Sequence, residues 1–233
     1  MCFHNSMSKK AQELAARYGK KSDIIEIVKD IIEENYHVNA FVFPNCPVIT
    51  SNEQIQTYLW GLIPFWTRSE TDALEIRKMT PNAKAETIFD KPSFREPIKS
   101  KRCVIPSTGF FEWRTEGTKK TPYYIQVKNE EIFSLAGIYD EWTNRETGEI
   151  LYTFSIITTA ANPLMEFIHN TKKRMPVILS KENESEWLNP RLSKSEIEKL
   201  LTPYPEHDMT AYIVANDFLK KNPHDPSIIE KVA

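Results

Sequence analysis

Closely spaced β-strand patterns in the middle of the chain constrain the fold more than any other feature. Between residues 102 and 159, apolar and aromatic residues gather in segments of strand length that short turn sequences separate. The first turn, Pro106-Ser107-Thr108-Gly109, has the composition of a tight reversal. The predicted strands are the two halves of 102–113, then 122–127, 132–142 and 151–159. Connections this short join antiparallel neighbours, so the chain is predicted to build a mainly antiparallel sheet.

Helical patterns surround this strand-rich region. Apolar residues recur at helical spacing in 11–18 and 24–31, and a capping box of Ser193 and Glu196 opens a later helix. Further helices are predicted within 67–80 and over 162–169, 181–188 and 193–201, and further strands over 36–43, 55–59, 175–179 and 209–215. Because no clear boundary is visible, residues 1–233 are predicted to form one α+β domain with an irregular tail at 216–233.

The charge balance does not indicate a strongly basic nucleic-acid-binding protein. The 233 residues carry a formal net charge of −2, so an anion-binding surface must be local, and the most basic stretch is 91–102. The three cysteines, Cys2, Cys46 and Cys103, form no C-x-x-C pair, which favours a reducing compartment. The sequence shows neither a run of roughly 18 apolar residues nor a signal-peptide pattern, so we expect a cytoplasmic monomer that needs no membrane.

The start of the chain, Met1-Cys2-Phe3-His4, holds the first candidate for chemistry. When an aminopeptidase removes Met1, Cys2 carries a free α-amine and a thiol, whose ordinary pKa values are near ~7.7–8.0 and ~8.5. Such an aminothiol condenses with an aldehyde to an imine, and the thiol then closes a five-membered thiazolidine ring. The alternative is an ordinary residue in a flexible terminus, and position alone favours that alternative.

Polar and aromatic residues farther along the chain make sense around such a nucleophile. Glu112 lies in the aromatic run Phe-Phe-Glu-Trp, where a carboxylate is disfavoured unless it is paired or used. His169 offers proton transfer at neutral pH, although a lone histidine at a helix end is more often structural. Trp60 and Trp66 flank a Gly- and Pro-containing bend. They are either core residues or a platform for an exposed base, and the sequence favours neither interpretation.

Several motifs, taken in order, resemble one known family. They are Met1-Cys2, Trp-Gly-Leu-Ile-Pro-x-Trp at 60–66, Asn-Ala-Lys-Ala-Glu-Thr at 82–87, Arg-Cys-x-x-Pro-x-x-Gly-Phe-Phe-Glu-Trp at 102–113, Leu-Ala-Gly-Ile-Tyr at 135–139, and His169 before Arg-Met-Pro at 174–176. This ordered set, from Cys2 to Leu179, closely resembles the SOS-response-associated peptidase (SRAP) family, whose members sense abasic sites in single-stranded DNA.

The resemblance implies a barrel-like sheet flanked by helices, with Cys2 at the floor of a basic cleft for single-stranded DNA. It also implies a covalent thiazolidine crosslink between the N-terminal cysteine and C1′ of the abasic deoxyribose, without a metal or organic cofactor. The catalytic residues that it implies are Cys2, Asn82, Glu112 and His169. The DNA-binding residues that it implies are Trp60, Trp66, Lys84, Arg102 and Arg174.

Three features depart from the common family pattern. Phe3-His4 stands where many members have Gly-Arg, and Lys84 stands where members often have Arg. Lysine binds phosphate only as a point charge, whereas arginine binds it with a planar fork of donors. The stretch 170–173 also makes the gap between His169 and Arg174 longer than in the familiar His-x-Arg-Met-Pro form.

Two other functions stay open on the sequence. A thiol peptidase would use Cys2 as the nucleophile, with Glu112 and His169 assisting, and its activity could be confined to removing the residue before Cys2. A non-covalent single-strand-binding module would use the basic stretch and the tryptophans, with equal, salt-sensitive affinity for intact and abasic strands. Capture of abasic sites is the preferred hypothesis.

Overall fold

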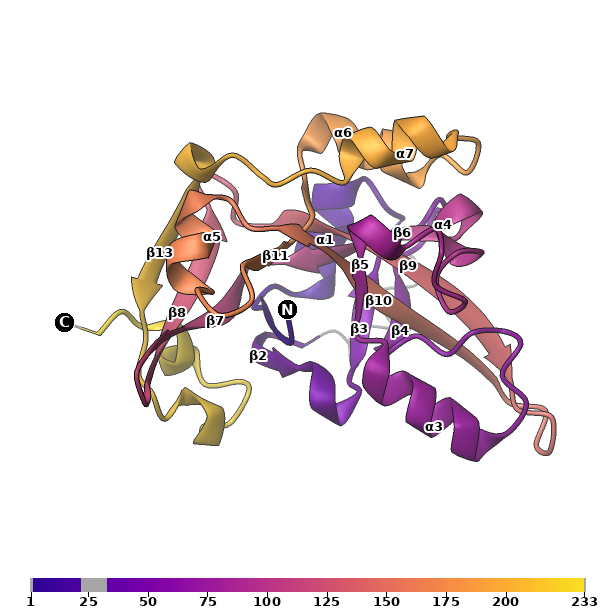
Figure 1. The fold of residues 1–233 in the computed structure, drawn as a ribbon, viewed down its shortest axis with the longest axis horizontal. Coiled ribbons are helices and arrows are strands. Elements are labelled where there is room, and N and C mark those ends of the chain that lie inside the picture. Colours follow the sequence, from indigo (N-terminus) through magenta and orange to yellow (C-terminus); the bar gives the residue numbers. More distant parts are fainter. Residues whose placement is uncertain (1, 22–32, 233) are drawn as a thin grey trace.

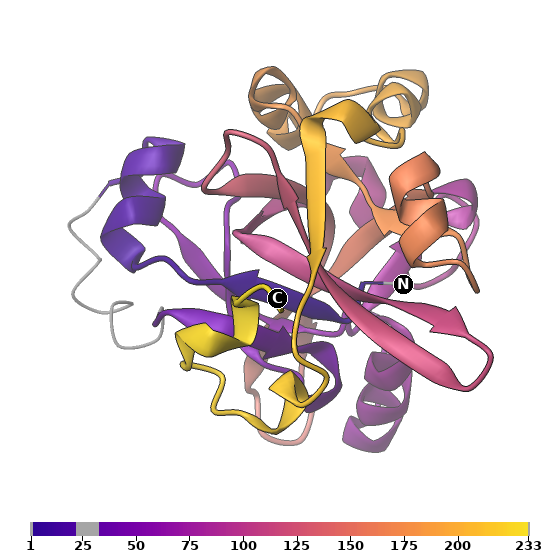
Figure 2. The same cartoon turned by 90° about the vertical axis from the view of Figure 1, so that its left-hand side faces the viewer.

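Two β-sheets form the framework of a computed structural model that describes residues 2–21 and 33–232 (Figure 1). Every neighbouring pair in the first sheet is antiparallel. Its order is β13 (Met209–Ile213), β8 (Lys119–Val127), β7 (Gly109–Glu116), β1 (His4–Met7) and β2 (Asn35–Asn39). In Figure 2, β1 (indigo) crosses the middle of the molecule. The segment that carries Cys2 therefore leads into a strand with neighbours on both sides.

The second sheet is mixed. It runs in the order β12 (Ile178–Leu179), β9 (Phe133–Thr143), β10 (Ile150–Ala160), β4 (Gln56–Trp60) and β3 (Asn45–Val48). Off this path, β6 (Arg102–Ser107) pairs with β9, and both β5 (Asn82–Lys84) and β11 (Arg174–Pro176) pair with β10. Only β4 and β5 run parallel to β10 among the described strand pairs. The α+β class with mainly antiparallel pairing is confirmed.

The sheets do not close into one barrel in the described part of the chain. The path of hydrogen-bonded strands ends at β3 and β12 in one sheet and at β2 and β13 in the other. One isolated bridge joins Ile49, just after β3, to Val104 of β6, with N–O distances of 2.9 and 2.8 Å. The barrel-like sheet that the resemblance implies is thus realised as two open sheets.

Short helices cover the sheets. They are α1 (Ala11–Tyr18), α3 (Glu70–Met79), α4 (Pro97–Ser100), α5 (Pro163–Ile168), α6 (Lys181–Leu188) and α7 (Lys194–Leu200). Helices α6 and α7 lie together on one side of the sheets, opposite α3 (Figures 1 and 2). Helix α1 buries Leu14 and ends at Gly19 with φ 59°, a left-handed conformation that suits glycine. Within the described ranges, no helix combines the length and apolar character that crossing a membrane requires.

Two predicted segments differ from the structure, and one cannot be compared. The strand predicted over 36–43 ends at Asn39, because the Asn39 side chain accepts a hydrogen bond from the Phe41 amide (3.0 Å) and starts the 3-10 turn η1 (Ala40–Val42). The tail after residue 215 is not wholly irregular. It forms the 3-10 turns η4 (Phe218–Lys220) and η5 (Pro226–Ile229), which bury Phe218 and Ile228. The helix predicted over 24–31 lies outside the described residues.

The first sheet depends on a close approach at the start of β7. A Cβ atom added to Gly109 would lie 2.1 Å from Cζ of Tyr124, a fully buried ring whose hydroxyl donates to the Thr108 carbonyl at 2.9 Å. We expect Gly109→Ala to destabilise the fold by about 1–3 kcal/mol through overpacking. Thermal unfolding would show this as a fall in Tm of roughly 2–4 °C per kcal/mol.

The control for this substitution is Lys119→Ala, at an exposed position of β8. A surface change of this kind usually stays within about 0.5 kcal/mol. An unchanged Tm in Gly109→Ala would show that the Tyr124 ring can move aside.

Candidate active site

Glu112 and His169 come together from different elements of the fold. Glu112 lies on β7 and His169 follows the last residue of α5, and both are buried. His169 Nδ1 lies 3.7 Å from Glu112 Oε1 and 3.0 Å from the Arg174 carbonyl oxygen. Because a carbonyl only accepts, Nδ1 carries the proton in the neutral ring and Nε2 is the basic nitrogen. The fold thus places a carboxyl group and an imidazole, two groups able to move protons, next to each other.

Cys2 lies near Glu112, in a buried position and not in a flexible terminus. Its side chain is fully buried, in a cluster with apolar residues of β4, β7, β9, β10 and α5. Burial and the nearby Glu112 charge raise the pKa of the Cys2 thiol to about 12. The thiol is therefore protonated at neutral pH, and a base must accept its proton before sulfur can attack.

Burial also shifts the pKa values of Glu112 and His169. It raises the pKa of Glu112 to about 7, because an ionised carboxylate is disfavoured in a dry site. It lowers the pKa of His169 to about 4, so the imidazole is neutral at physiological pH. Glu112 can then donate or accept a proton near neutral pH, which suits a general acid–base residue.

Aromatic rings cover both faces of β7 around Glu112 and exclude water from this part of the strand. Alternation places Phe111 and Trp113 on the face away from Glu112. The ring of Phe218, from the C-terminal segment, stacks on Phe111 at 4.5 Å and on Trp113 at 5.8 Å between centroids. With Phe110 buried on the Glu112 face, both faces of the strand are covered.

The loop between His169 and Arg174 is tied to the same strand. Asn170 Nδ2 donates to the Thr115 carbonyl at 2.8 Å, and its Oδ1 accepts from the Thr115 amide at 3.1 Å. Lys173 adopts φ 50°, and its amide donates to the His169 carbonyl at 2.8 Å. The longer gap thus forms a closed loop anchored on β7 and holds His169 beside Glu112.

Asn82 is a buried amide on the parallel strand β5, in register with Ile156 of β10. Within the described residues, neither its Oδ1 nor its Nδ2 has a hydrogen-bond partner. A buried polar group left in this state costs about 1–3 kcal/mol, and such groups gather where a ligand completes them. Asn82 lies on a strand, and Glu86 lies in the 3-10 turn η2 (Ala85–Thr87).

Two of the predicted DNA-binding residues are built into the core. Arg102 is 3% exposed, and its guanidinium donates to the carbonyls of residues 98, 99, 187 and 189. Trp60 is 1% exposed, and its Nε1 donates to the Pro81 carbonyl at 2.9 Å. Arg102 holds α4 and α6 against β6, and Trp60 packs on Phe154. Neither side chain can reach a strand of DNA, so both predictions are corrected.

The other three DNA-binding candidates reach the surface to different extents. Lys84 is exposed, and Trp66 is 41% exposed. Arg174 is mostly buried; it forms a double contact with Glu86 at 2.5 and 2.9 Å and donates to the Thr158 carbonyl at 2.6 Å. A phosphate at Arg174 would therefore compete with Glu86. No sequence pattern indicates this ion pair between Arg174 and Glu86.

His4 does not replace the arginine that many family members carry at this position. Its Nδ1 lies 2.8 Å from Nε2 of His37 on β2, and burial lowers the pKa of His4 to about 3. Burial also lowers the pKa of His37 to about 4. Both rings are neutral at physiological pH and pair with each other. We therefore do not expect His4 to supply a phosphate contact.

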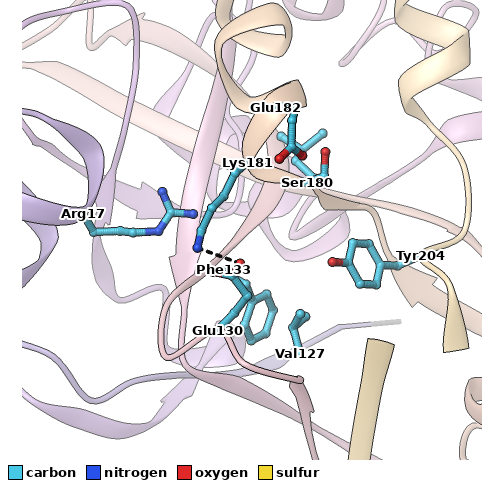
Figure 3. A pocket seen from close by; sticks show the side chains of 9 residues that line it. Arg17, Val127, Glu130, Phe133, Ser180, Lys181, Glu182 and Tyr204 are labelled. Atoms are coloured by element: carbon cyan, nitrogen blue, oxygen red, sulfur yellow. Dashed lines mark ion pairs between the residues drawn. The ribbon is translucent and has the colours of Figure 1, made fainter. Parts of the chain in front are cut away.

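A separate pocket of about 100 Å³ lies at the start of α6 (Figure 3). Its lining residues are Arg17, Val127, Glu130, Phe133, Leu179, Ser180, Lys181, Glu182 and Tyr204. The two cations are already paired, Arg17 with Glu184 at 2.6 Å and Lys181 with Glu130 at 2.8 Å. None of the predicted site residues is among the residues that line it, so this pocket is distinct from the Cys2 site.

Comparisons with known proteins agree with this arrangement. Abasic site processing protein YoqW of Bacillus subtilis is 41% identical over 223 residues, which cover 91% of this chain and 96% of the relative. Abasic site processing protein HMCES of Gallus gallus is 34% identical over 175 residues, 66% of this chain and 51% of the relative. A crystal structure of a Bacteroides thetaiotaomicron protein shares 62% identity and a TM-score of 0.98 over the full length of both chains. The family model for SOS response associated peptidase (SRAP) matches residues 1–220. The chain therefore belongs to the SRAP family.

Proposed function

We propose that this protein captures abasic sites in single-stranded DNA by forming a thiazolidine between Cys2 and C1′ of the abasic sugar after Met1 is removed. The observation that carries the proposal is the position of Cys2, buried near Glu112, a carboxyl group with a pKa of about 7 that lies 3.7 Å from the neutral His169. Relatives named as abasic site processing proteins support the same conclusion.

The first step forms an imine. The α-amine of Cys2 attacks the C1′ aldehyde of the ring-opened sugar, and the carbonyl oxygen becomes a hydroxyl. Protonated Glu112 donates a proton to this hydroxyl, which leaves as water, and the C–N bond becomes a protonated imine that keeps the second amine hydrogen on nitrogen. Before this step, Glu112 and His169 can move the protons that open the closed hemiacetal form of the sugar.

The second step closes the ring. The thiol attacks the imine carbon and forms the C–S bond, and its proton passes to Glu112, which became a carboxylate in the first step. The C=N electron pair moves onto nitrogen, which keeps the proton that it carried in the protonated imine, and Glu112 is again protonated, so the sum is aldehyde plus aminothiol to thiazolidine plus water. The neutral amide of Asn82 is available to hydrogen-bond the adduct without changing its charge.

The DNA surface that we propose is smaller than the sequence predicted. Lys84 and Trp66 are its exposed members, and Arg174 contributes when a phosphate displaces Glu86. Selectivity would come from the aldehyde and from the flexible, unstacked backbone at the missing base, and not from the sequence of bases.

A crosslinking assay tests the proposal. Purified protein is mixed with single-stranded DNA that carries one abasic site, resolved on a denaturing gel, and its intact mass is measured. We expect a heat-stable shifted band from protein lacking Met1, and no band with DNA whose aldehyde has been reduced to an alcohol. Absence of the band despite complete Met1 removal would overturn the proposal. Equal binding of intact and abasic strands would then favour the non-covalent module.

A further inference from the structure

The turn η1 (Ala40–Val42) exposes an aromatic ring to solvent beside the start of the chain. Phe41 is 58% exposed and packs against Phe3, the residue after Cys2, with 4.8 Å between ring centroids and 33° between ring planes. We propose that Phe41 is the stacking partner of the nucleobase next to the abasic nucleotide. This inference rests on the proposed function, because it concerns the same DNA strand.

One backbone hydrogen bond ties the turn to the segment that carries the nucleophile, and two further hydrogen bonds fix the shape of the turn. The Ala40 amide donates to the Phe3 carbonyl at 2.9 Å, and the Phe43 amide donates to the Ala40 carbonyl at 3.1 Å. The Asn39 side chain caps the turn by accepting from the Phe41 amide at 3.0 Å. The Phe41 ring is therefore fixed relative to the segment that carries Cys2, and a strand bound at Cys2 meets it in one orientation.

The turn also carries backbone strain. Phe43 has φ 53°, a left-handed conformation that is unfavourable for a bulky residue. It is held there by Arg77, whose guanidinium lies 4.4 Å from the Phe43 ring centroid and donates to the Phe43 carbonyl at 3.3 Å. As a result, the side chains of Phe41 and Val42 are exposed to water and add nothing to the hydrophobic core. Strain that presents apolar side chains to solvent indicates a binding role.

The chemistry of an abasic site fits an exposed ring at this place. The base beside the missing one has lost a stacking neighbour, so one of its faces is open to water. An aromatic side chain replaces that neighbour whatever the base, because every base has a π-face. Trp60, which the sequence offered for this role, is buried, whereas more than half of Phe41 is exposed.

The surroundings of the turn favour a nucleotide over an apolar protein segment. A hollow of about 320 Å³ borders it, and half of its lining residues are polar or charged, namely Asn35, His37, Asn39, Asn45 and Lys221. Amide side chains can pair with a base edge, and Lys221, whose ammonium donates to the Ser227 hydroxyl at 2.7 Å, adds a positive charge. The exposed apolar surface of the turn itself consists of two side chains, Phe41 and Val42.

Binding to unreactive DNA tests the inference separately from crosslinking. The probes are single strands with a tetrahydrofuran abasic analogue, which has no aldehyde, flanked either by adenines or by further tetrahydrofuran residues. We expect Phe41→Ala to weaken binding to the adenine-flanked probe about five-fold or more, since stacking on one aromatic side chain is worth that much. Binding to the probe without flanking bases should not change, and Phe41→Trp should restore the difference between the probes.

The control is Ile150→Ala, which removes an exposed apolar side chain of β10 (52% exposure) that belongs neither to the turn nor to the hollow beside it. It should leave the difference between the two probes as in the wild type. An equal loss on both probes, or no loss on either, would overturn the assignment of Phe41 to a base and leave the turn to another partner. Crosslinking of aldehyde DNA by the wild type reports on the proposed function alone, so the two can fail independently.

Discussion

Cys2→Ala protein is expected to give no heat-stable crosslink to abasic DNA, a loss down to the level seen with aldehyde-free DNA. Alanine is small, so Met1 is still removed and the α-amine remains. The amine alone can form only the imine, which water reverses. Borohydride added during the reaction should therefore trap a product from Cys2→Ala, whereas the wild type should need no reductant. The measurement is a denaturing gel with and without borohydride.

The controls for this substitution are the other two cysteines. Cys46 and Cys103 are buried in the same apolar cluster as Cys2, yet neither carries an α-amine. Cys46→Ala and Cys103→Ala should crosslink like the wild type if thermal unfolding shows that they are folded. A heat-stable band from Cys2→Ala without borohydride would refute the thiazolidine mechanism.

Glu112→Gln is expected to slow crosslinking by about 10²–10⁴-fold, the usual contribution of a general acid–base residue. The dependence of the crosslinking rate on pH tests the role of Glu112 more specifically. In the wild type, the rate should rise as the α-amine loses its proton, near its ordinary pKa of ~7.7–8.0. It should fall as Glu112, with a pKa of about 7, loses the proton that it donates. We expect a bell-shaped profile with a maximum near neutral pH, and no descending alkaline limb in Glu112→Gln.

The raised pKa of Glu112 also predicts that Glu112→Gln, although less active, is more stable than the wild type at neutral and alkaline pH. The pKa of Glu112 is higher in the folded protein than its ordinary value of 4.5, so its favourable contribution is fully present below pH 4.5 and is lost as pH rises through about 7. Glutamine stays neutral at every pH. Glu112→Gln should therefore gain Tm relative to the wild type as pH rises from 4.5 to 8, while it loses activity.

Glu116→Gln provides the matched control. Glu116 lies on the same strand, four positions further on, where it is exposed and pairs with Arg114 at 3.0 Å. It should alter neither the crosslinking rate nor the shape of the pH profile. An alkaline limb that persists in Glu112→Gln would assign that pKa to another group.

Local patterns predicted the part of the fold that local physics determines. The strands between residues 102 and 159 follow from alternation and turn residues, and Glu112 was identified because a carboxylate in an aromatic run needs a reason. Helix α7 begins at its predicted capping box, where the Glu196 amide donates to Ser193 Oγ at 3.4 Å.

Long-range contacts determined what the sequence could not reveal. Arg102 looked like the end of a basic surface, but two of its carbonyl partners come from residues 187 and 189, far along the chain. The pairing of His4 with His37 and the parallel register of β5 with β10 likewise depend on segments that have no local signal for each other.

Because β1 lies between two other strands, Met1 is most easily removed before β1 docks into the sheet. Ser6 bonds Thr108 across 102 positions of the chain, so β1 docks only after a large part of the protein has been synthesised, and such non-local closure is slow. Once β1 has docked, the Cys2 side chain is fully buried, so an aminopeptidase that must bind Cys2 in its own active site would first have to undock the start of the strand. We therefore expect removal of Met1 to occur on the nascent chain, so that a slower-acting aminopeptidase would leave a stable, correctly folded and permanently unreactive population.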